Sequence, residues 1–345
     1  MAMNKVRDSA PHIGVFGAGA VGAYLGVRLS SAGYRVTLVG RAQLVERVGQ
    51  LQAIDLNGES CGPGPRLSAT VEPGALAECD ICLVSVKCGD TEAAGAALAR
   101  ILAPEALVIS FQNGLGNAER LRRAGLTAQR VLAGVVSFNV RRDDTRLSKA
   151  TDGPLLVEGP DPARAQVLRR VFADARETLE LRADLLGVQA NKLLLNLNNG
   201  LCALTGVSVA RSLASSDLRW CFATCMREGI EVMRAAGIPI VRVGRIYPPL
   251  VARLLNLPDF IVDRVVQFFR RVDDDARSST LQDIDAGKKT EIDYLNGEIV
   301  NLARAAGRDA PANRFVVDRV HELENQRPPR FLTPEMVRAG IRAPG

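Results

Sequence analysis

Short apolar runs alternate with helical patterns over the first half of the chain. The run Ile13–Gly17 predicts a buried parallel strand, and an apolar helical pattern over Ala20–Ser31 follows it directly. Four further apolar runs predict strands at Tyr34–Gly40, Ile81–Lys87, Ala106–Phe111 and Val131–Val140, and PLLVEG after them predicts an antiparallel addition. This alternation is typical of an α/β Rossmann fold with a doubly wound, mostly parallel sheet.

From Asp184 onward the pattern is almost entirely helical. The predicted helices are Leu185–Cys202, Asp217–Ala236, Phe260–Arg271, Glu291–Ala306 and Ala312–Asn325. The tail from Arg327 is rich in proline and predicts irregular structure. A chain of 345 residues is longer than most single domains. We therefore expect a Rossmann domain over residues 1–183 and an all-α domain over 184–345, with an irregular C-terminal tail.

Composition excludes several classes of protein. No stretch approaches the roughly 18 apolar residues of a membrane span, and the N-terminus lacks the apolar core of a signal peptide. The seven cysteines are odd in number and irregularly spaced, which favours reduced, buried thiols in a soluble cytoplasmic protein. The pair Cys79 and Cys82 lies in an apolar run and indicates a core strand rather than a redox or metal pair. A dispersed net charge of +6 and 4% aromatic residues argue against nucleic-acid binding and suit anionic small molecules.

Histidine and lysine are both scarce. The only two histidines, His12 and His321, exclude a Ser–His–Asp triad and a multi-histidine metal site. Six of the 44 cationic Lys and Arg side chains are lysines, so a lysine within an apolar segment indicates a need for an ammonium group.

A glycine motif, GAGAVG, joins the first predicted strand to the first predicted helix. Gly17 would allow the tight turn, Gly19 would let the backbone approach a pyrophosphate, and Gly22 would let the helix pack closely on the sheet. The phosphates would sit on the helix N-terminus at Ala20 and Val21, where free N–H groups favour anions. In this strand–turn–helix context the motif predicts a nicotinamide dinucleotide.

The end of the second predicted strand favours NADPH over NADH. An NAD site carries Asp or Glu there to hold the ribose 2′-hydroxyl, whereas this chain has Arg41, which would pair with a 2′-phosphate. The alternative is a solvated loop arginine. Lys87 ends another strand at the same sheet edge, and FQNGLGN follows the next one, so Asn113 either presents its amide to a ligand or caps the following helix.

The helical segment ANKLLLNLNNG places Lys192, Asn196 and Asn199 on one face. Because the rest of this segment is leucine, the polar face would line a cleft, where partial burial lowers a lysine pKa and assists proton donation. The alternative is a lysine that extends to solvent beside buried asparagine amides. Glu291 is open to a structural reading as well, since Thr290 would cap a helix and Glu291 would complement its dipole.

These residues together resemble the ketopantoate reductases (2-dehydropantoate 2-reductases). The resemblance runs from about Ile13 to Glu324 and rests on GAGAVG, the two strand-end cations, QNGLG, the Lys–Asn helix and SSTLQDIDAGKKTEIDYLNG. It implies a Rossmann domain and a helical domain with the active site in the cleft between them. It also implies NADPH, bound near Arg41 and Lys87, and reduction of the small 2-keto acid ketopantoate to pantoate, on the route to vitamin B5 and coenzyme A.

The resemblance also implies a role for each candidate side chain. Lys192 would donate the proton to the forming alkoxide, and Glu291 would bind the hydroxyl side of the substrate and position the lysine. Asn113 would lie at the nicotinamide and support Lys192. Asn196 would bind the substrate hydroxyl, and Ser279 its carboxylate. No metal is implied.

Two departures from the family pattern put the substrate in question. The family often has Asn followed by Pro four residues after Asn196, whereas this chain has Gly200, with Asn199 one place early. The segment Pro239–Arg277 also carries an extra apolar stretch, which would reshape the cleft or form the contact of a homodimer. The alternatives are a reductase of another branched or bulky 2-keto acid, a β-hydroxyacid dehydrogenase, or a non-catalytic dinucleotide-binding regulator.

Overall fold

The computed structural model describes residues 10–127, 130–257 and 277–343, and the chain divides into two compact units. The first unit comprises Met1–Gln112 and Gly116–Leu185, and the second comprises Asn113–Leu115 and Leu186–Gly345. The chain therefore enters the second unit briefly at residues 113–115 before it returns to complete the first.

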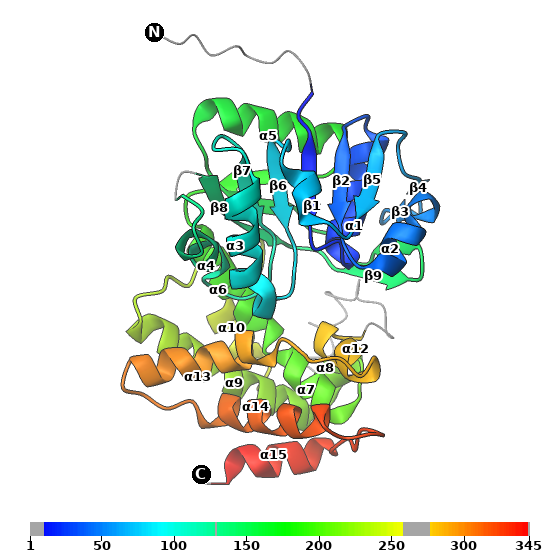
Figure 1. Ribbon diagram of the computed structural model, residues 1–345. Helices are drawn as coiled ribbons and strands as arrows, with labels where there is room; N and C mark the ends of the chain where they lie inside the picture. The colour runs from blue at the N-terminus through cyan, green and yellow to red at the C-terminus, as the bar shows by residue number, and fades with distance from the viewer. Residues whose placement is uncertain (1–9, 128–129, 258–276, 344–345) are drawn as a thin grey trace. The chain divides into compact units, whose positions relative to one another are not determined.

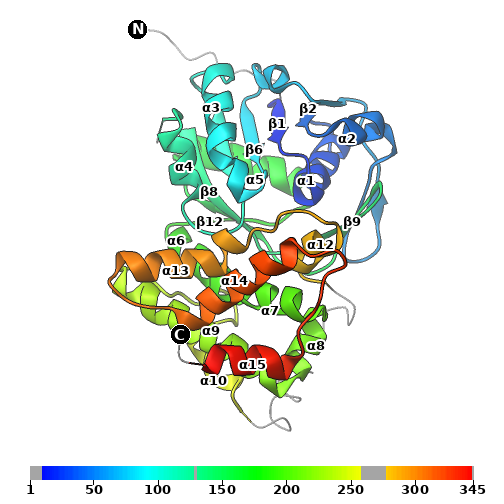
Figure 2. The ribbon, with the colours of Figure 1, turned by 60° about the horizontal axis from the view of Figure 1, so that its bottom comes forward.

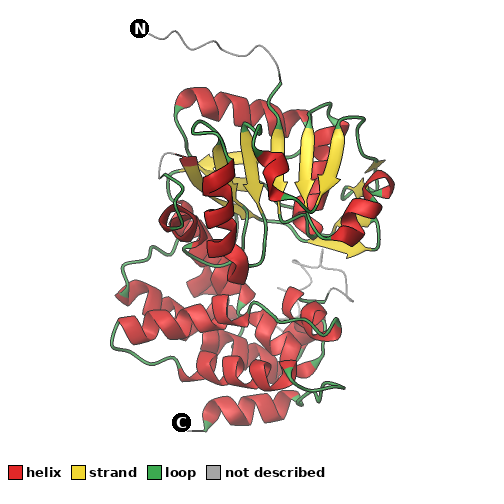
Figure 3. Cartoon of the chain, viewed as in Figure 1, coloured by secondary structure: helices red, strands yellow, loops and turns green. Residues whose placement is uncertain are grey.

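The first unit is built on an eight-stranded sheet in the order β12-β11-β8-β7-β6-β1-β2-β5 (Figures 1 and 3). Its strands are β1 (Ile13–Phe16), β2 (Val36–Val39), β5 (Leu67–Thr70), β6 (Ile81–Val84), β7 (Leu107–Ser110), β8 (Val131–Val136), β11 (Leu155–Glu158) and β12 (Leu179–Arg182). All neighbours are parallel except β11 and β8. The predicted parallel sheet and its antiparallel addition are both confirmed, and the inner strands are apolar throughout because helices cover both faces.

Helix α1 (Ala20–Ser31) follows β1, as the pattern predicted, and most of its residues are buried. The other helical segments of the first unit are α2 (Ala42–Glu46), η1 (Val48–Gln50), η2 (Pro73–Leu76), η3 (Cys88–Asp90), α3 (Thr91–Ile101), α4 (Asn117–Arg123) and α5 (Pro162–Asp174). Helix α5 starts with Pro162 at a position that needs no N–H donor, and the Asp161 side chain accepts from the N–H of Arg164.

A second, four-stranded sheet in the first unit was not predicted. It has the order β4-β3-β10-β9, with β3 (Gln52–Ile54), β4 (Ser60–Cys61), β9 (Val140–Asp143) and β10 (Arg146–Lys149). The strands are short and polar, and only Ala53 and Leu147 are fully buried in them. This small sheet contacts α1 through β3, β4, β9 and β10.

The second unit is helical, as predicted (Figures 2 and 3). Its segments are α6 (Leu185–Asn196), α7 (Asn198–Thr205), α8 (Val209–Ala214), α9 (Ser216–Ala235), α10 (Pro248–Leu254), α12 (Ser279–Asp285), η5 (Ile292–Tyr294), α13 (Asn296–Ala305), α14 (Pro311–Glu324) and α15 (Pro334–Arg342). They enclose one apolar core, to which α6, α7, α9, α13 and α14 contribute most of the buried side chains.

Three predicted features of the second unit are wrong. The helix predicted over Leu185–Cys202 is interrupted at Leu197, and the helix predicted over Glu291–Ala306 is a 3-10 turn followed by α13. The tail is not irregular throughout, because the Thr333 hydroxyl accepts from the N–H of Met336 and starts α15. The stretch predicted as a helix over Phe260–Arg271 lies entirely outside the described residues.

All seven cysteines are free thiols, and all except the half-buried Cys61 are buried. A hydrogen bond with Cys79, and then burial, raise the pKa of Cys82, as expected for a thiol of the core. In the described parts of the chain, no helix is both long and apolar enough to cross a membrane. Within the same ranges, no three His, Cys, Asp or Glu side chains are grouped so as to hold a metal ion.

Candidate active site

The three glycines of the loop after β1 differ in the space that surrounds them. Gly17 has φ +95°, and a Cβ there would lie 2.5 Å from the backbone nitrogen of Val86. A Cβ on Gly22 would lie 2.3 Å from Oγ of Ser85. A Cβ on Gly19 would meet nothing within 4 Å. Gly17 and Gly22 therefore serve the close packing of the loop, whereas the surface at Gly19 is open to a ligand.

The first turn of α1 offers backbone donors at this open surface. Gly19 precedes the helix and provides no side-chain cap. The N–H groups of Ala20, Val21 and Gly22 lie in the first turn, where an α-helix supplies no acceptor of its own. Because these donors and the positive end of the helix dipole coincide, the loop fits a phosphate group.

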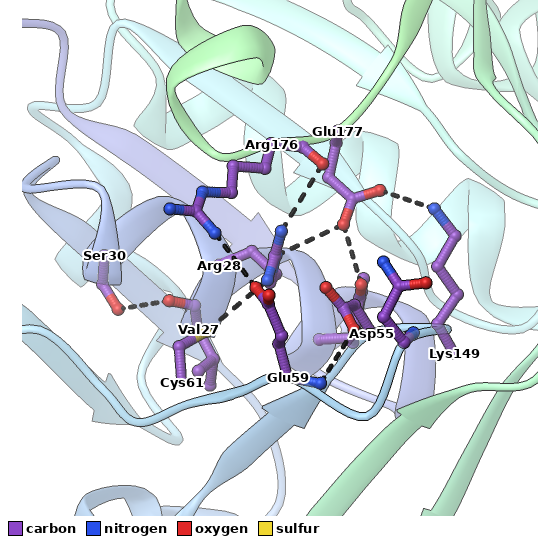
Figure 4. Close-up of polar contacts among 11 residues, drawn as sticks. Val27, Arg28, Ser30, Asp55, Glu59, Cys61, Lys149, Arg176 and Glu177 are labelled. Atoms are coloured by element: carbon purple, nitrogen blue, oxygen red, sulfur yellow. Dashed lines mark hydrogen bonds and ion pairs between the residues drawn. The ribbon is translucent and has the colours of Figure 1, made fainter.

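Buried charges hold α1 against the small sheet and the segment before β12 (Figure 4). Glu177, two residues before β12, lies 3.3 Å from Nε of Arg28 and accepts from Nζ of Lys149 at 2.9 Å. Its other contact is the hydroxyl of Tyr24, which donates at 2.7 Å. Burial and the Glu177 charge raise the pKa of Tyr24, which therefore stays protonated as a donor. Two segments far from α1 in the sequence, at Lys149 and Glu177, thus fix the helix that carries the glycine loop.

The two predicted cofactor cations flank this loop. Strand β1 lies between β2 and β6, and all three run parallel. Arg41 follows β2 by two residues, immediately precedes α2 and is exposed. Lys87 follows β6 by three residues, precedes η3 and is half-buried. Both side chains therefore start at the carboxyl edge of the sheet, where open α/β sheets bind ligands.

Gln112 is a residue that the sequence analysis passed over. Its Nε2 donates to Oγ1 of Thr91 at 2.7 Å and to the carbonyl of Val86 at 3.2 Å, and its Oε1 accepts from Ser110 at 3.0 Å. Val86 is the residue against which Gly17 packs. Gln112 therefore holds the loop that carries Lys87. The sequence feature that indicates such a role is a glutamine immediately after a buried strand.

In the second unit, the polar face predicted on the Lys–Asn segment is present. Lys192, Asn196 and Asn199 are half-buried, whereas Leu193 and Leu194 between them are fully buried. The interruption at Leu197 preserves this face because that residue keeps α-helical dihedral angles. Asn196 and Asn199 are half-buried, whereas Asn191 and Asn198 of the same segment are buried, so Lys192 lies among asparagines of both kinds.

Asn113 belongs to the second unit and does not cap α4. That helix begins after Gly116, which has φ +71° and supplies no side-chain cap. Leu115 is buried in the same core as the leucines of α6. A Cβ on Gly114 would lie 2.8 Å from the carbonyl oxygen of Tyr294, so this loop packs directly on η5.

Glu291 immediately precedes η5 and is half-buried. The Thr290 hydroxyl accepts from the N–H of Ile292 at 3.2 Å, which closes a local turn, and α13 starts only at Asn296. The interpretation of Glu291 as a first-turn carboxylate of a long helix is therefore wrong. The segment that carries Glu291 instead packs against the loop that carries Asn113.

Two further predicted residues contact each other. Nδ2 of Asn199 donates to Oγ of Ser279 at 3.4 Å, and the neighbouring Ser278 donates to the Asn199 carbonyl at 3.3 Å. Gly200 faces away, into the core, where a Cβ would lie 2.5 Å from Cγ1 of Val316. A side chain at Gly200 would therefore force Val316 or its neighbours to shift.

Comparisons with known proteins cover most of the chain. A family model described as "Ketopantoate reductase PanE/ApbA" matches residues 13–159, and its C-terminal counterpart matches residues 184–324. A 2-dehydropantoate 2-reductase of Archaeoglobus fulgidus is 27% identical over 90% of this chain and 97% of its own length.

Two solved structures share the fold. A PanE/ApbA family ketopantoate reductase from Ralstonia eutropha JMP134 has a TM-score of 0.78 and 31% identity, over 91% of this chain and 98% of its own. A D-mandelate dehydrogenase solved with NADH and anilino(oxo)acetate has a TM-score of 0.77 and 21% identity, over 91% and 98%.

Proposed function

Because this chain belongs to the ketopantoate reductase PanE/ApbA family, we propose that it reduces 2-dehydropantoate to pantoate with NADPH. Membership of this family makes the chain an oxidoreductase acting on CH–OH groups. The family resemblance inferred from the motifs is thereby confirmed. The observation that carries the proposal is the half-buried polar face of α6 and α7. The loop that carries Asn113 and the segment that carries Glu291 pack on the same apolar core as these two helices.

The glycine loop fits a nicotinamide dinucleotide, which supplies the hydride when it is bound. The open surface at Gly19 and the first-turn donors of α1 would hold the pyrophosphate. Arg41 stands where an NAD site carries a carboxylate, and among the described residues no carboxylate forms an ion pair with it. Arg41 and Lys87 would therefore hold the 2′-phosphate of NADPH.

Lys192 would act as the proton donor. Reduction of the keto carbon leaves negative charge on the former carbonyl oxygen, and an ammonium group at that oxygen stabilises the charge and then transfers a proton to it. Glu291 would orient Lys192 and accept a hydrogen bond from the substrate hydroxyl, and Asn113 would support Lys192 from the adjoining loop.

The remaining polar residues would bind the substrate. Asn196 would contact the substrate hydroxyl from the same face as the lysine. Ser279 would donate to the substrate carboxylate, and its contact with Asn199 holds both side chains at the start of α12. A hydroxyl and an amide can both donate to a carboxylate, so this pair suits the acid end of a 2-keto acid.

Gly200 supports a second candidate function, reduction of another branched or bulky 2-keto acid. The family pattern places an asparagine there, and the packing of Gly200 against Val316, Asn296 and Ile292 leaves no room for it. The amide of Asn199 starts one residue earlier, about 100° around the helix axis, and would therefore reach the substrate from another direction.

Oxidation of NADPH with ketopantoate, followed by absorbance beside a panel of other 2-keto acids, tests the substrate. The highest kcat/KM with ketopantoate would support the first candidate. A preference for a different branched keto acid would support the second and point to Asn199 and Gly200. The absence of turnover on the whole panel would contradict both.

Lys192→Ala tests the mechanism. We expect kcat to fall by a factor on the order of 10²–10⁴ because the general acid is lost. The Kd for NADPH should stay unchanged, and Lys288→Ala, at an exposed lysine, serves as the control. An unchanged kcat in Lys192→Ala would remove Lys192 from the mechanism.

A further inference from the structure

The turn between β9 and β10 is fastened to the segment that follows Arg41. Helix α2 starts after Arg41 and ends before Arg47. Arg47 forms an ion pair with Asp144, in the turn. The N–H of Gln52 donates to the carbonyl of Thr145 at 2.9 Å, so the turn is held at a second point. The turn of the small sheet therefore lies beside the end of α2, the short helix that Arg41 precedes.

Arg142 projects from this hairpin toward α1. It pairs across the antiparallel strands with Leu147, so the two side chains share a face of the small sheet. Leu147 is fully buried, and Lys149, two residues further along the same face, reaches the Glu177 carboxylate that also pairs with Arg28 of α1. Arg142 thus lies on the α1 side, whereas its neighbours along β9 face the opposite side.

Arg142 and Arg41 bring two positive charges close together, and no carboxylate in the described part of the chain neutralises them. Asp144 pairs with Arg47, and no carboxylate of the described residues forms an ion pair with Arg41 or Arg142. Partial burial, and then the charges of Arg41 and Arg47, lower the pKa of Arg142. Like charges held together without a counter-charge cost stability, and a bound anion would offset that cost.

We propose that Arg142 is a second arginine for the 2′-phosphate of NADPH, presented by the small sheet to the site that Arg41 begins. The inference rests on the proposed NADPH specificity and adds a residue to it. Nε of Arg142 donates to the carbonyl of Asp144 at 3.0 Å, which fixes the direction of the side chain. The two terminal nitrogens of the guanidinium still have donors for phosphate oxygens, which a planar fork contacts in pairs.

Fluorescence titration of the full-length protein with NADPH and with NADH tests this assignment without any substrate. The variants are Arg142→Ala, Arg41→Ala as the reference, and Arg146→Ala as a control on the opposite face of the same hairpin. We expect Arg142→Ala to raise the Kd for NADPH about tenfold while the Kd for NADH changes less than about twofold. Arg146→Ala should leave both Kd values unchanged, and Arg142→Lys should recover part of the NADPH affinity.

Competition by 2′,5′-ADP and by 5′-ADP isolates the phosphate itself. Arg142→Ala should weaken only the 2′-phosphorylated ligand, and the difference should shrink as salt screens the charges. An unchanged NADPH Kd, or equal weakening of NADPH and NADH, would overturn the role of Arg142 while the wild-type preference stands. A wild-type protein that binds NADH as tightly as NADPH would instead refute the proposed cofactor, and this inference with it.

Discussion

Replacement of Glu177 by glutamine tests whether the buried charge cluster fixes α1. The Glu177 side chain is 2% exposed and serves two cations, Arg28 and Lys149, whose side chains are 7% and 11% exposed. Glutamine keeps the shape and can still accept from Tyr24. The substitution therefore removes the negative charge and leaves two buried cations together without a counter-charge.

The expected loss follows from this burial. Breaking a buried ion pair by neutralising one partner costs about 3–5 kcal/mol, because the other charge stays buried and uncompensated. The matched control is Glu59→Gln, which breaks an ion pair with Arg176 beside the cluster. That pair has a similar 3.1 Å distance, but its side chains are 65% and 76% exposed, so the loss should stay below about 1 kcal/mol.

Urea unfolding measures both variants. Circular dichroism follows the whole chain, and fluorescence of Trp220, the single tryptophan, follows the second unit. Glu177→Gln should lower the dichroism midpoint, and the added substitution Lys149→Met should recover part of the loss by removing one excess cation. If Glu177→Gln were no less stable than Glu59→Gln, the charge of Glu177 would not stabilise the cluster and our reasoning would be refuted.

Three further substitutions test packing and polar contacts, each by thermal or urea unfolding. Gly17→Ala should cost about 2–4 kcal/mol, because its backbone is left-handed and its Cβ meets Val86, and wild-type stability would contradict the steric argument. Gln112→Ala should cost about 1–3 kcal/mol by leaving buried polar atoms without a partner, and it should weaken NADPH binding; an effect on neither would show that the loop orders itself. Gly200→Ala should cost about 1–3 kcal/mol, and a Val316→Ala background should relieve most of that cost; equal costs in both backgrounds would contradict the overlap.

The sequence was sufficient wherever local pattern decides the structure. The buried strand Ile13–Phe16, the glycines after it and helix α1 form one local unit, and their bounds were predicted to within a residue. The polar face of Lys192 and Asn196 was also predictable, because helical periodicity alone sets it.

Features that depend on distant contacts were not predictable. Asn113 belongs to the second unit, and the neighbouring Gly114 packs against Tyr294, some 180 residues away by the numbering, so no local pattern indicates this placement. The small sheet was not predicted because its strands each bury one side chain at most and show little alternation of apolar and polar residues. Helix α15 is different, since Thr333 and Pro334 are helix start signals that the sequence contains.

The excursion of residues 113–115 into the second unit limits how this protein can be recombined. Dividing the chain after Leu185 is the simplest way to exchange C-terminal halves between relatives. This division would separate Leu115 from the core in which it is buried. The donor half would then be paired with a foreign three-residue insert, and a mismatch at one buried leucine costs about 2–5 kcal/mol. Chimeras should therefore exchange two pieces of chain together, the tripeptide Asn113–Leu115 and everything after Leu185.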